Sequence, residues 1–472
     1  MAVLFAVLAR DGLAPIEAAW LSVVGYAAIT ASLAGASRRL AVPALVALVM
    51  VVFGGFSAVV AVPESPEAAA ERAQELTPEQ VEESTPAESF DARVNEDGFE
   101  HAVALTGLGG MAAILGSLIA AVLVAPAPER RRRSPRRIER IGRLLVSIGF
   151  LGVLAALARY GLTQFPIDDL WESFKSFWIG GTIFLLIATF AVPGFGFWVA
   201  GLRERSAPRR DYLAPGLLAA IYLALLAPTG QRGFVIALAV VALAILISSR
   251  LINLKQATAL VVVGIALIGL TQSVRNEAST TGQVSLDRIV DGIQPSQWRD
   301  LYSNQIASVN WTALIHQNRE RLDIPNSIVA LVEKPIPRSI APDKSQGFGT
   351  EFTSQVFPAA AEKSVSFATP LIAELDFNFG LVPAVLIVGV IGALATIADM
   401  RIARRAPKAV EAIVTATIFW TFFELTRGDL ANAIVFSSGW IVPLVFFSRG
   451  LGLRSYPEVR RLVVDALQVA PQ

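Results

Sequence analysis

Residues 379–398 read FGLVPAVLIVGVIGALATIA, twenty consecutive residues without a charged side chain. An α-helix rises about 1.5 Å per residue, so a stretch of this length crosses the roughly 30 Å hydrocarbon core of a bilayer. Ten further apolar runs of about 15 to 25 residues contain few or no charged side chains: Leu13–Ala36, Leu40–Val62, Ala102–Val124, Ile141–Gly161, Trp178–Leu202, Tyr212–Ala227, Phe234–Ser248, Ala257–Gln272, Ala409–Phe423 and Leu430–Phe447. The sequence therefore predicts an all-α polytopic membrane protein with eleven transmembrane helices, or twelve if Met1–Ala9 belongs to another helix.

The composition agrees with this prediction. Of the 472 residues 54% are hydrophobic and 17% are charged, whereas a soluble domain carries about 25% charge. This balance excludes a soluble globular enzyme, a disordered protein and a nucleic-acid binder. The chain has no cysteine, which excludes disulfides, thiolate metal sites and a cysteine nucleophile. Its two histidines, His101 and His316, are too few for a histidine-based metal centre, so we expect no metal and no cofactor.

Charge predicts the orientation of the helices. Most of the basic residues fall in alternate segments, and the densest group is Arg130–Arg133. Short loops rich in lysine and arginine face the cytoplasm, which places the C-terminus inside and the first span starting outside. The segments assigned to the cytoplasmic side are Ser37–Arg39, Ala125–Arg140, Arg203–Asp211, Ser249–Gln256, Asp399–Lys408 and the tail from Ser448. We expect the remaining charges to lie at the extracytoplasmic ends of the spans.

Two long loops interrupt the membrane helices and define six regions. Residues 63–100 are acidic and rich in proline, alanine and serine, which is typical of a solvated spacer; binding of a partner is the alternative. Residues 273–378 contain aromatic residues and apolar residues at helical spacing, so we expect amphipathic helices that cover the extracytoplasmic face. The other regions are the helices of 1–62, 101–272 and 379–447 and the cytoplasmic tail 448–472.

Three of the predicted spans are short. Tyr212–Ala227, Phe234–Ser248 and Ala409–Phe423 have about 15 residues, a helix of only about 24 Å. The ends of these spans should therefore lie below the headgroup plane, and with them Arg232 and Arg427. An arginine at that depth needs water, an acid or an anionic ligand, so the pair predicts an anion site. Alternatively, both side chains extend to the surface or pair with acids at the same helix ends.

A stiff basic segment and an acidic segment complete the candidate site. Prolines between Glu333 and Lys344 hold Lys334, Arg338 and Lys344 in extended chain, an arrangement suited to a phosphate or diphosphate. Glu374 comes just before the span that begins at Phe379. Its carboxylate either caps the N-terminus of a helix or removes a proton from a sugar hydroxyl.

These motifs, in this order, resemble those of the Wzy-type oligosaccharide repeat unit polymerases, O-antigen polymerase-like membrane glycosyltransferases of the GT-C type. The resemblance covers about residues 179–447. It rests on Pro228-Thr-Gly-Gln-Arg-Gly233, Arg275 after the next span, Ile336-Pro-Arg-Ser339 with Lys344, the segment from Glu374 to Asn378-Phe-Gly380, and Arg427. The chain departs from the usual pattern in reading Gly-Gln-Arg-Gly rather than Gly-Ser-Arg-Gly, and in its acidic 63–100 insertion.

The resemblance implies an enzyme of the bacterial cytoplasmic (inner) membrane. It would join oligosaccharide units carried on polyprenyl diphosphate, as donor and acceptor, at the extracytoplasmic face, with a chain-length regulator as a further partner. Glu374 would be the general base and Glu424 the second candidate for that role. The residues that would bind the diphosphate or glycan and stabilise the departing diphosphate are Arg232, Arg275, Arg338, Lys344 and Arg427. The alternatives are an O-antigen ligase-like or peptidoglycan-type glycosyltransferase, a lipid-linked oligosaccharide flippase and a scaffolding protein.

Overall fold

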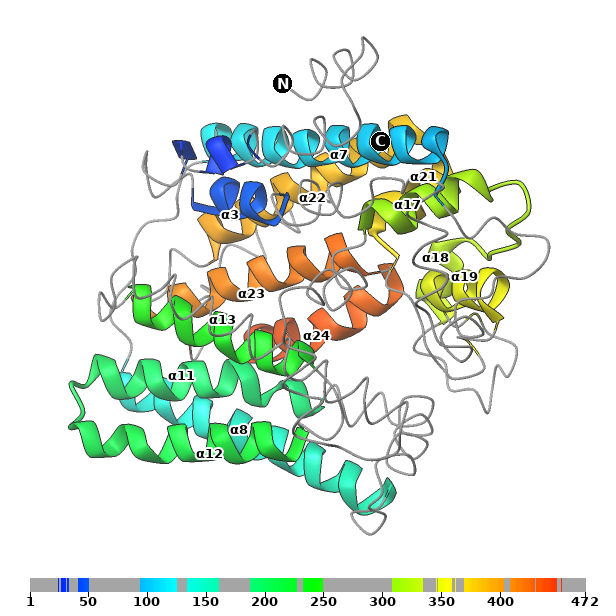
Figure 1. The fold of residues 1–472 in the computed structure, drawn as a ribbon. Coiled ribbons are helices and arrows are strands. Elements are labelled where there is room, and N and C mark those ends of the chain that lie inside the picture. Colours follow the sequence, from blue (N-terminus) through cyan, green and yellow to red (C-terminus); the bar gives the residue numbers. More distant parts are fainter. Residues whose placement is uncertain are drawn as a thin grey trace, which may run out of the picture. The chain divides into compact units, whose positions relative to one another are not determined.

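The computed structural model describes part of the chain in detail. The described residues are 24, 27–30, 32–33, 41–50, 94–124, 134–160, 187–226, 232–248, 308–333, 345, 347–358, 361, 369–402, 408–428, 430–447 and 451. Within these ranges every regular element is a helix (Figure 1). The predicted all-α class is therefore confirmed for the described residues.

Most of the described helices overlap predicted apolar runs, with shifted ends. Their bounds are α3 Ala41–Met50, α7 Glu96–Leu123, α8 Pro135–Tyr160, α11 Ala191–Glu204, η3 Arg209–Tyr212, α12 Leu213–Leu226, α13 Arg232–Ser248, α17 Ser308–Gln317, α18 Ser327–Glu333, α19 Phe348–Val356, α21 Leu371–Phe379, α22 Leu381–Arg401, α23 Lys408–Arg427 and α24 Leu430–Phe446. The chain divides into two compact units: residues 1–124, 285–397 and 419–437 form the first, and residues 125–284, 398–418 and 438–472 form the second.

In the first unit, α7 and α22 lie side by side and run parallel. A Cβ on Gly116 would lie 2.0 Å from the carbonyl oxygen of Gly389, and one on Gly392 would lie 2.2 Å from that of Ala113. The backbones thus approach as closely as only glycine allows, as in tightly packed membrane helices. Ser117 completes the contact by donating a hydrogen bond from Oγ to the carbonyl oxygen of Gly392 at 2.9 Å.

The short helices α17, α18 and α19 fall within the predicted 273–378 region, and α21 extends one residue beyond it, to Phe379. Trp311 of α17 and Phe352 of α19 pack edge to face, with ring centroids 6.4 Å apart, in a buried cluster that includes Phe357 and Ala373 of α21. The predicted aromatic, helical character of this region is therefore confirmed in its described part. That these helices cover an extracytoplasmic face stays a prediction.

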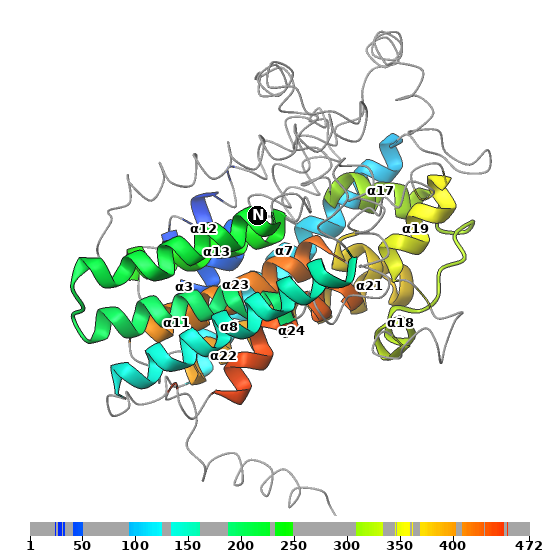
Figure 2. The same cartoon turned by 90° about the horizontal axis from the view of Figure 1, so that it is seen from below.

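The second unit is organised by an antiparallel pair, α8 and α11, which lie next to each other in both ribbon views (Figures 1 and 2). Glycines again set the spacing, because a Cβ on Gly142 would lie 2.2 Å from the backbone nitrogen of Trp198. At one end of the pair the buried carboxylate of Glu139 accepts a hydrogen bond from Arg205 Nε at 2.9 Å. Arg205 also donates to Asp211 at 2.8 Å, so two ion pairs of Arg205 stabilise this end.

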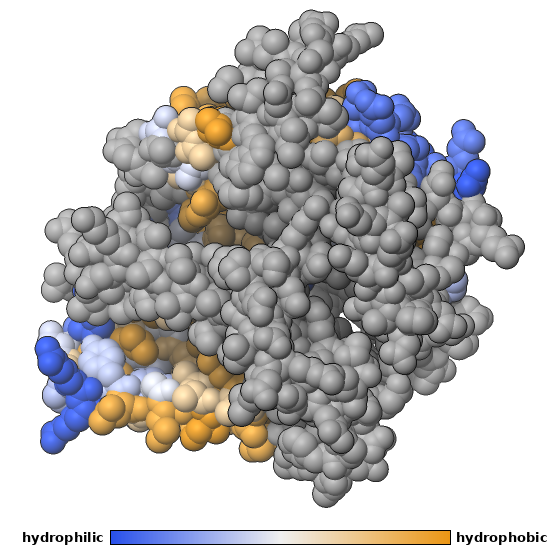
Figure 3. All heavy atoms as spheres, in the orientation of Figure 1, coloured by the Kyte–Doolittle hydropathy of each residue, from blue (hydrophilic) through white to orange (hydrophobic). Residues whose placement is uncertain are grey.

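Among the described helices, two, α7 and α22, are long and apolar enough to cross a membrane. The most apolar part of α22 has a mean hydropathy of 2.5, yet only 17% of it is buried. Its exposed apolar side chains recur every four residues, at Val382, Leu386, Val390 and Leu394. In the second unit, apolar side chains are exposed along α12, next to the charged residues of the preceding turn (Figure 3). The eleven predicted spans are not all among the described helices.

Several predicted boundaries are wrong. Residues 96–100, expected in the acidic loop, form the first turn of α7, where Asn95 accepts a hydrogen bond from Gly98 N–H at 2.7 Å. Arg232, expected in a turn, begins α13. The span expected over Ala409–Phe423 is part of a 20-residue helix that includes Glu424 and Arg427. That length, about 30 Å, removes the argument that a short helix draws these two residues below the headgroup plane.

Candidate functional site

Helix α21 carries the polar residues of the candidate site in the first unit. The helix begins after Pro370, whose extended backbone favours a helix start, and ends at Gly380, whose φ is +83°. The N–H of Gly380 donates to the carbonyl oxygen of Asp376 at 2.8 Å. This break separates α21 from α22, so Glu374 lies on a short helix of its own and not at the start of the long span.

Glu374 is buried, with 1% of its surface exposed. Its Oε2 accepts a hydrogen bond from the backbone N–H of Leu430, the first residue of α24, at 2.7 Å. The carboxylate therefore caps α24, where the helix dipole favours negative charge. The sequence allowed for a capping role at the helix that follows Glu374, and the helix that it caps lies more than fifty residues further along the chain.

Asn378 ties α21 to a neighbouring helix. Its Nδ2 donates to Oγ of Ser327, the first residue of α18, at 2.7 Å and to the carbonyl oxygen of Glu374, also at 2.7 Å. Both bonds restrict the turn of α21 that carries Glu374. Asn378 thus fixes the backbone at Glu374, while the Leu430 N–H holds its carboxylate.

Asp376, two residues before Asn378, lies against both histidines of the chain. His101 Nε2 of α7 lies 3.2 Å from Asp376 Oδ2, and the rings of His101 and His316 of α17 stack with centroids 3.5 Å apart and an angle of 11° between their planes. Arg319 donates to the carbonyl oxygens of Asp376 and Phe377, each at 3.1 Å. An arginine at the C-terminus of α21 satisfies carbonyls that the helix leaves open.

His316 has an unusual environment. Its Nδ1 is buried and has no hydrogen-bond partner among the described residues. A buried polar atom without a partner costs about 1–3 kcal/mol. Burial, followed by the nearby His101, lowers the pKa of His316. Both effects favour the neutral imidazole over the charged one.

The other two described candidates lie at the end of α23. Glu424 is buried and Arg427 is half-buried, and Arg427 acts electrostatically on the Glu424 carboxylate. Leu425, between them, packs with Leu371 and Leu375 of α21 and with Leu430 of α24. The end of α23, the start of α24 and the helix that carries Glu374 thus meet in one place.

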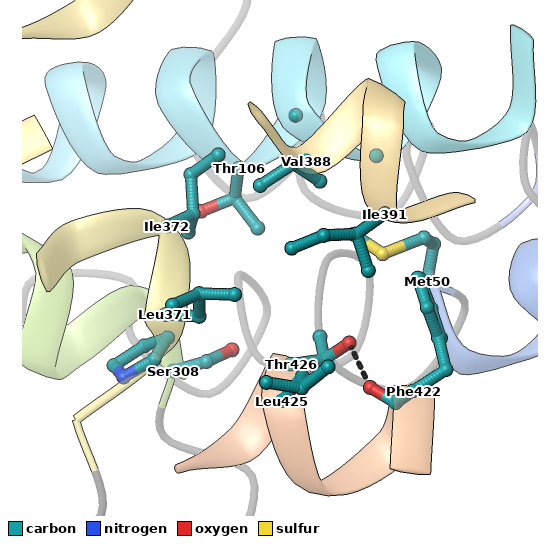
Figure 4. A pocket seen from close by; sticks show the side chains of 13 residues that line it. Met50, Thr106, Ser308, Leu371, Ile372, Val388, Ile391, Phe422, Leu425 and Thr426 are labelled. Carbon is teal, nitrogen blue, oxygen red and sulfur yellow. Dashed lines mark hydrogen bonds between the residues drawn. The ribbon is translucent and has the colours of Figure 1, made fainter. Parts of the chain in front are cut away.

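A cavity lies beside this junction (Figure 4). It contains about 460 Å³ of empty space, counting the part open to solvent. The polar side chains that line it are the hydroxyls of Thr106, Ser308 and Thr426, and Thr426 Oγ1 donates to the carbonyl oxygen of Phe422 at 2.8 Å. The remaining lining residues are Met50, Gly109, Gly110, Pro370, Leu371, Ile372, Val388, Ile391, Phe422 and Leu425. Its chemistry suits a hydrocarbon and not an anion.

The predicted site residues divide into three groups. Glu374, Glu424 and Arg427 belong to the first unit, whereas Arg232 begins α13 in the second unit. Arg275, Arg338 and Lys344 lie outside the described residues, so their convergence on one cavity stays a prediction.

The sequence did not indicate the cluster of His101, His316 and Asp376. Two histidines were judged too few for a metal centre, but the fold stacks their rings beside Asp376. Asp376 lies two residues after Glu374, His101 directly follows the acidic 63–100 loop, and His316 lies in the middle of the 273–378 region. The rarity of histidine in the chain was the only signal available.

Comparison with protein families, with curated proteins and with solved structures gave no match for this chain.

Proposed function

We propose that the protein polymerises oligosaccharide repeat units carried on polyprenyl diphosphate, at the extracytoplasmic face of the bacterial cytoplasmic membrane. The observation that carries this proposal is the buried carboxylate of Glu374, held at 2.7 Å from the N–H of Leu430, on a helix that also lines an apolar cavity. A fixed acid beside a hydrocarbon-lined space is what a transferase needs when its substrate is a sugar on a lipid.

The packing of the two candidate spans supports the membrane part of the proposal. The predicted topology has both Ala102–Val124 and Phe379–Ala398 entering from the extracytoplasmic side, and their helices α7 and α22 run parallel. It has Ile141–Gly161 and Trp178–Leu202 crossing in opposite directions, and α8 and α11 run antiparallel. The exposed apolar stripe of α22 suits contact with lipid better than contact with water.

The apolar cavity supports a lipid-linked substrate. A polyprenyl chain is a branched hydrocarbon, and a lining of aliphatic side chains with three hydroxyls offers it no unpaired charge to bury. A diphosphate would instead need cations, and the lining has none. The proposal therefore places the first part of the lipid in the cavity and assigns the diphosphate to the arginines, of which Arg427, at the end of α23, belongs to the same unit as the cavity.

In the proposed reaction Glu374 accepts the proton of the acceptor sugar hydroxyl. The hydroxyl oxygen forms a bond to the anomeric carbon of the donor, the bond from that carbon to the diphosphate oxygen breaks, and polyprenyl diphosphate leaves with the electron pair. Negative charge grows on the leaving oxygens, where Arg232, Arg275, Arg338 and Arg427 stabilise it. Glu424 is the alternative base.

The test is elongation of a polyprenyl-diphosphate-linked repeat unit by the purified full-length protein in lipid nanodiscs. Wild-type protein should produce a ladder of lengthened lipid-linked products, and Glu320→Gln, a change at an exposed glutamate, should match it. Transfer to another glycan without lengthening would favour the ligase-like alternative. Movement of the lipid-linked sugar across the membrane without any new glycosidic bond would overturn the proposal in favour of a flippase.

A further inference from the structure

We infer that His101, His316 and Asp376 form a binding site for a divalent transition metal of the zinc class. The three candidate ligand atoms all lie within 4.8 Å of one another. They come from three different helices, α7, α17 and α21, that pack against each other within the first unit. This inference is independent of the proposed function, since it rests on a cluster that takes no part in the proposed reaction.

The ligand set is chemically suitable. Two imidazoles and one carboxylate are ligands that zinc accepts at about 2.0–2.2 Å, and bonds of that length separate the ligand atoms of a tetrahedral ion by about 3.3 Å. His101 Nε2 and Asp376 Oδ2 are already 3.2 Å apart. The third atom, from His316, has to approach the other two by a rotation of its ring. Three protein ligands leave a fourth position for water or another group.

The state of the histidines also favours a metal. The Nδ1 atom of His316 is buried and without a hydrogen-bond partner among the described residues, so a metal bond would satisfy an atom that otherwise has none. The stacked rings lie 3.5 Å apart, with the Asp376 carboxylate beside them.

The surroundings hold the three helices in place. Gln317 Oε1, next to His316, accepts a hydrogen bond from the backbone N–H of Asn95 at 3.2 Å, and a Cβ on Gly98 would lie 2.9 Å from the same oxygen. The start of α7 is thus fixed against the end of α17. Arg319 Nη1 lies 3.9 Å from Asp376 Oδ2, so this cation competes with a metal for the carboxylate. The shorter hydrogen bonds of Arg319 are to backbone carbonyls.

The first experiment is a titration of chelator-treated, full-length protein with Co²⁺ and then Zn²⁺, using an affinity tag without histidine. Because the chain has only two histidines and no cysteine, imidazole-bound cobalt reports this site alone. We expect one cobalt per chain with visible d–d absorption, displaced by zinc. His101→Gln and His316→Gln should each weaken binding by at least about 10- to 100-fold, Asp376→Asn should also weaken it, and the matched control Asp323→Asn should bind as the wild type does.

A second measurement needs no variant and so remains decisive if a substitution prevents folding. In wild-type protein labelled with ¹⁵N-histidine, one equivalent of Zn²⁺ should shift the ring nitrogen signals of both histidines. Absence of cobalt absorption in the wild type, zinc shifts at only one histidine or at neither, or undiminished binding by folded His101→Gln and His316→Gln proteins would overturn the inference.

Discussion

The carboxylate of Glu374 on α21 accepts a hydrogen bond from the backbone N–H of Leu430, the first residue of α24, with 2.7 Å between Oε2 and the nitrogen. Two segments that are distant along the chain are joined by this bond, and a buried acid is placed at the start of a helix. The same side chain thus has a structural role and a proposed chemical one. Substitutions that change its charge and its hydrogen-bonding capacity separately will distinguish the two.

Replacing Glu374 by alanine should destabilise the protein, because the cap of α24 is lost. We expect a cost of about 0.5–2 kcal/mol, the usual range for a lost helix cap. Glu374→Gln keeps an oxygen that accepts the Leu430 N–H, so its loss of stability should be smaller. Thermal unfolding of the purified proteins in detergent measures both, and equal stability of Glu374→Ala and the wild type would mean that the cap contributes little.

Replacing Glu374 by glutamine should also reduce turnover, by about 10²–10⁴ if the carboxylate is the general base, while binding of the donor survives. Elongation and donor binding are measured on the same preparation, with Glu424→Gln as the comparison. Near-normal elongation by Glu374→Gln, with a strong loss in Glu424→Gln, would move the base to Glu424 and leave Glu374 as a cap.

Replacing Arg232 by lysine should impair binding as well as turnover. The change keeps the charge at the start of α13 but removes the planar, two-pronged donor that matches a phosphate. We expect most of the polymerising activity to be lost, with folding and membrane insertion intact. Donor binding distinguishes this variant from Glu374→Gln, and near-normal elongation would show that the diphosphate is held elsewhere.

Replacing Gly392 by alanine should destabilise the first unit. The added Cβ would lie 2.2 Å from the carbonyl oxygen of Ala113, a backbone atom that moves only with α7, so we expect a cost of about 1–3 kcal/mol. The matched control is Gly216→Ala in α12, where a Cβ meets nothing within 4 Å; there alanine should stabilise the helix by up to about 1 kcal/mol. Equal effects of the two changes on thermal unfolding would contradict the close α7–α22 contact.

Replacing Arg319 by glutamine should have two opposite effects. The carbonyls of Asp376 and Phe377 lose their donor, which should cost about 1 kcal/mol of stability. The affinity for zinc should rise, because a cation 3.9 Å from Asp376 is removed. Arg210→Gln, at a side chain that is 86% exposed, is the control for both measurements. A fall in zinc affinity would mean that Arg319 positions Asp376 rather than competing for it.

Much of the fold could be predicted because helix length and hydropathy are local properties of the chain. The apolar runs located α8, α12, α13 and α24, and most of the predicted ends of these helices lie within a few residues of the observed ones. The end of α23 was missed because Glu424 and Arg427 are charged. A span predicted from hydropathy ends at the first charged residues, whereas the backbone hydrogen bonds of a helix continue past them.

The candidate site could be predicted only in part. Glu374 was found because an acid just before an apolar run is conspicuous, but its partner is a backbone N–H on a helix whose position the sequence does not specify. His101 and His316 were discounted as too few, since the number of residues of one type does not reveal that tertiary packing stacks their rings. Side chains brought together from three helices have no signature in the spacing of the sequence.

The break at Gly380 has a consequence for chirality. Its backbone, at φ +83° and ψ 169°, occupies a region that is essentially closed to L-residues and costs them about 1–3 kcal/mol. The mirror image of that conformation is ordinary extended chain, and the space around the missing Cβ is open. A D-alanine introduced by chemical ligation would therefore fit where L-alanine does not, and by limiting the unfolded chain it would hold α21 to α22 more firmly than glycine does.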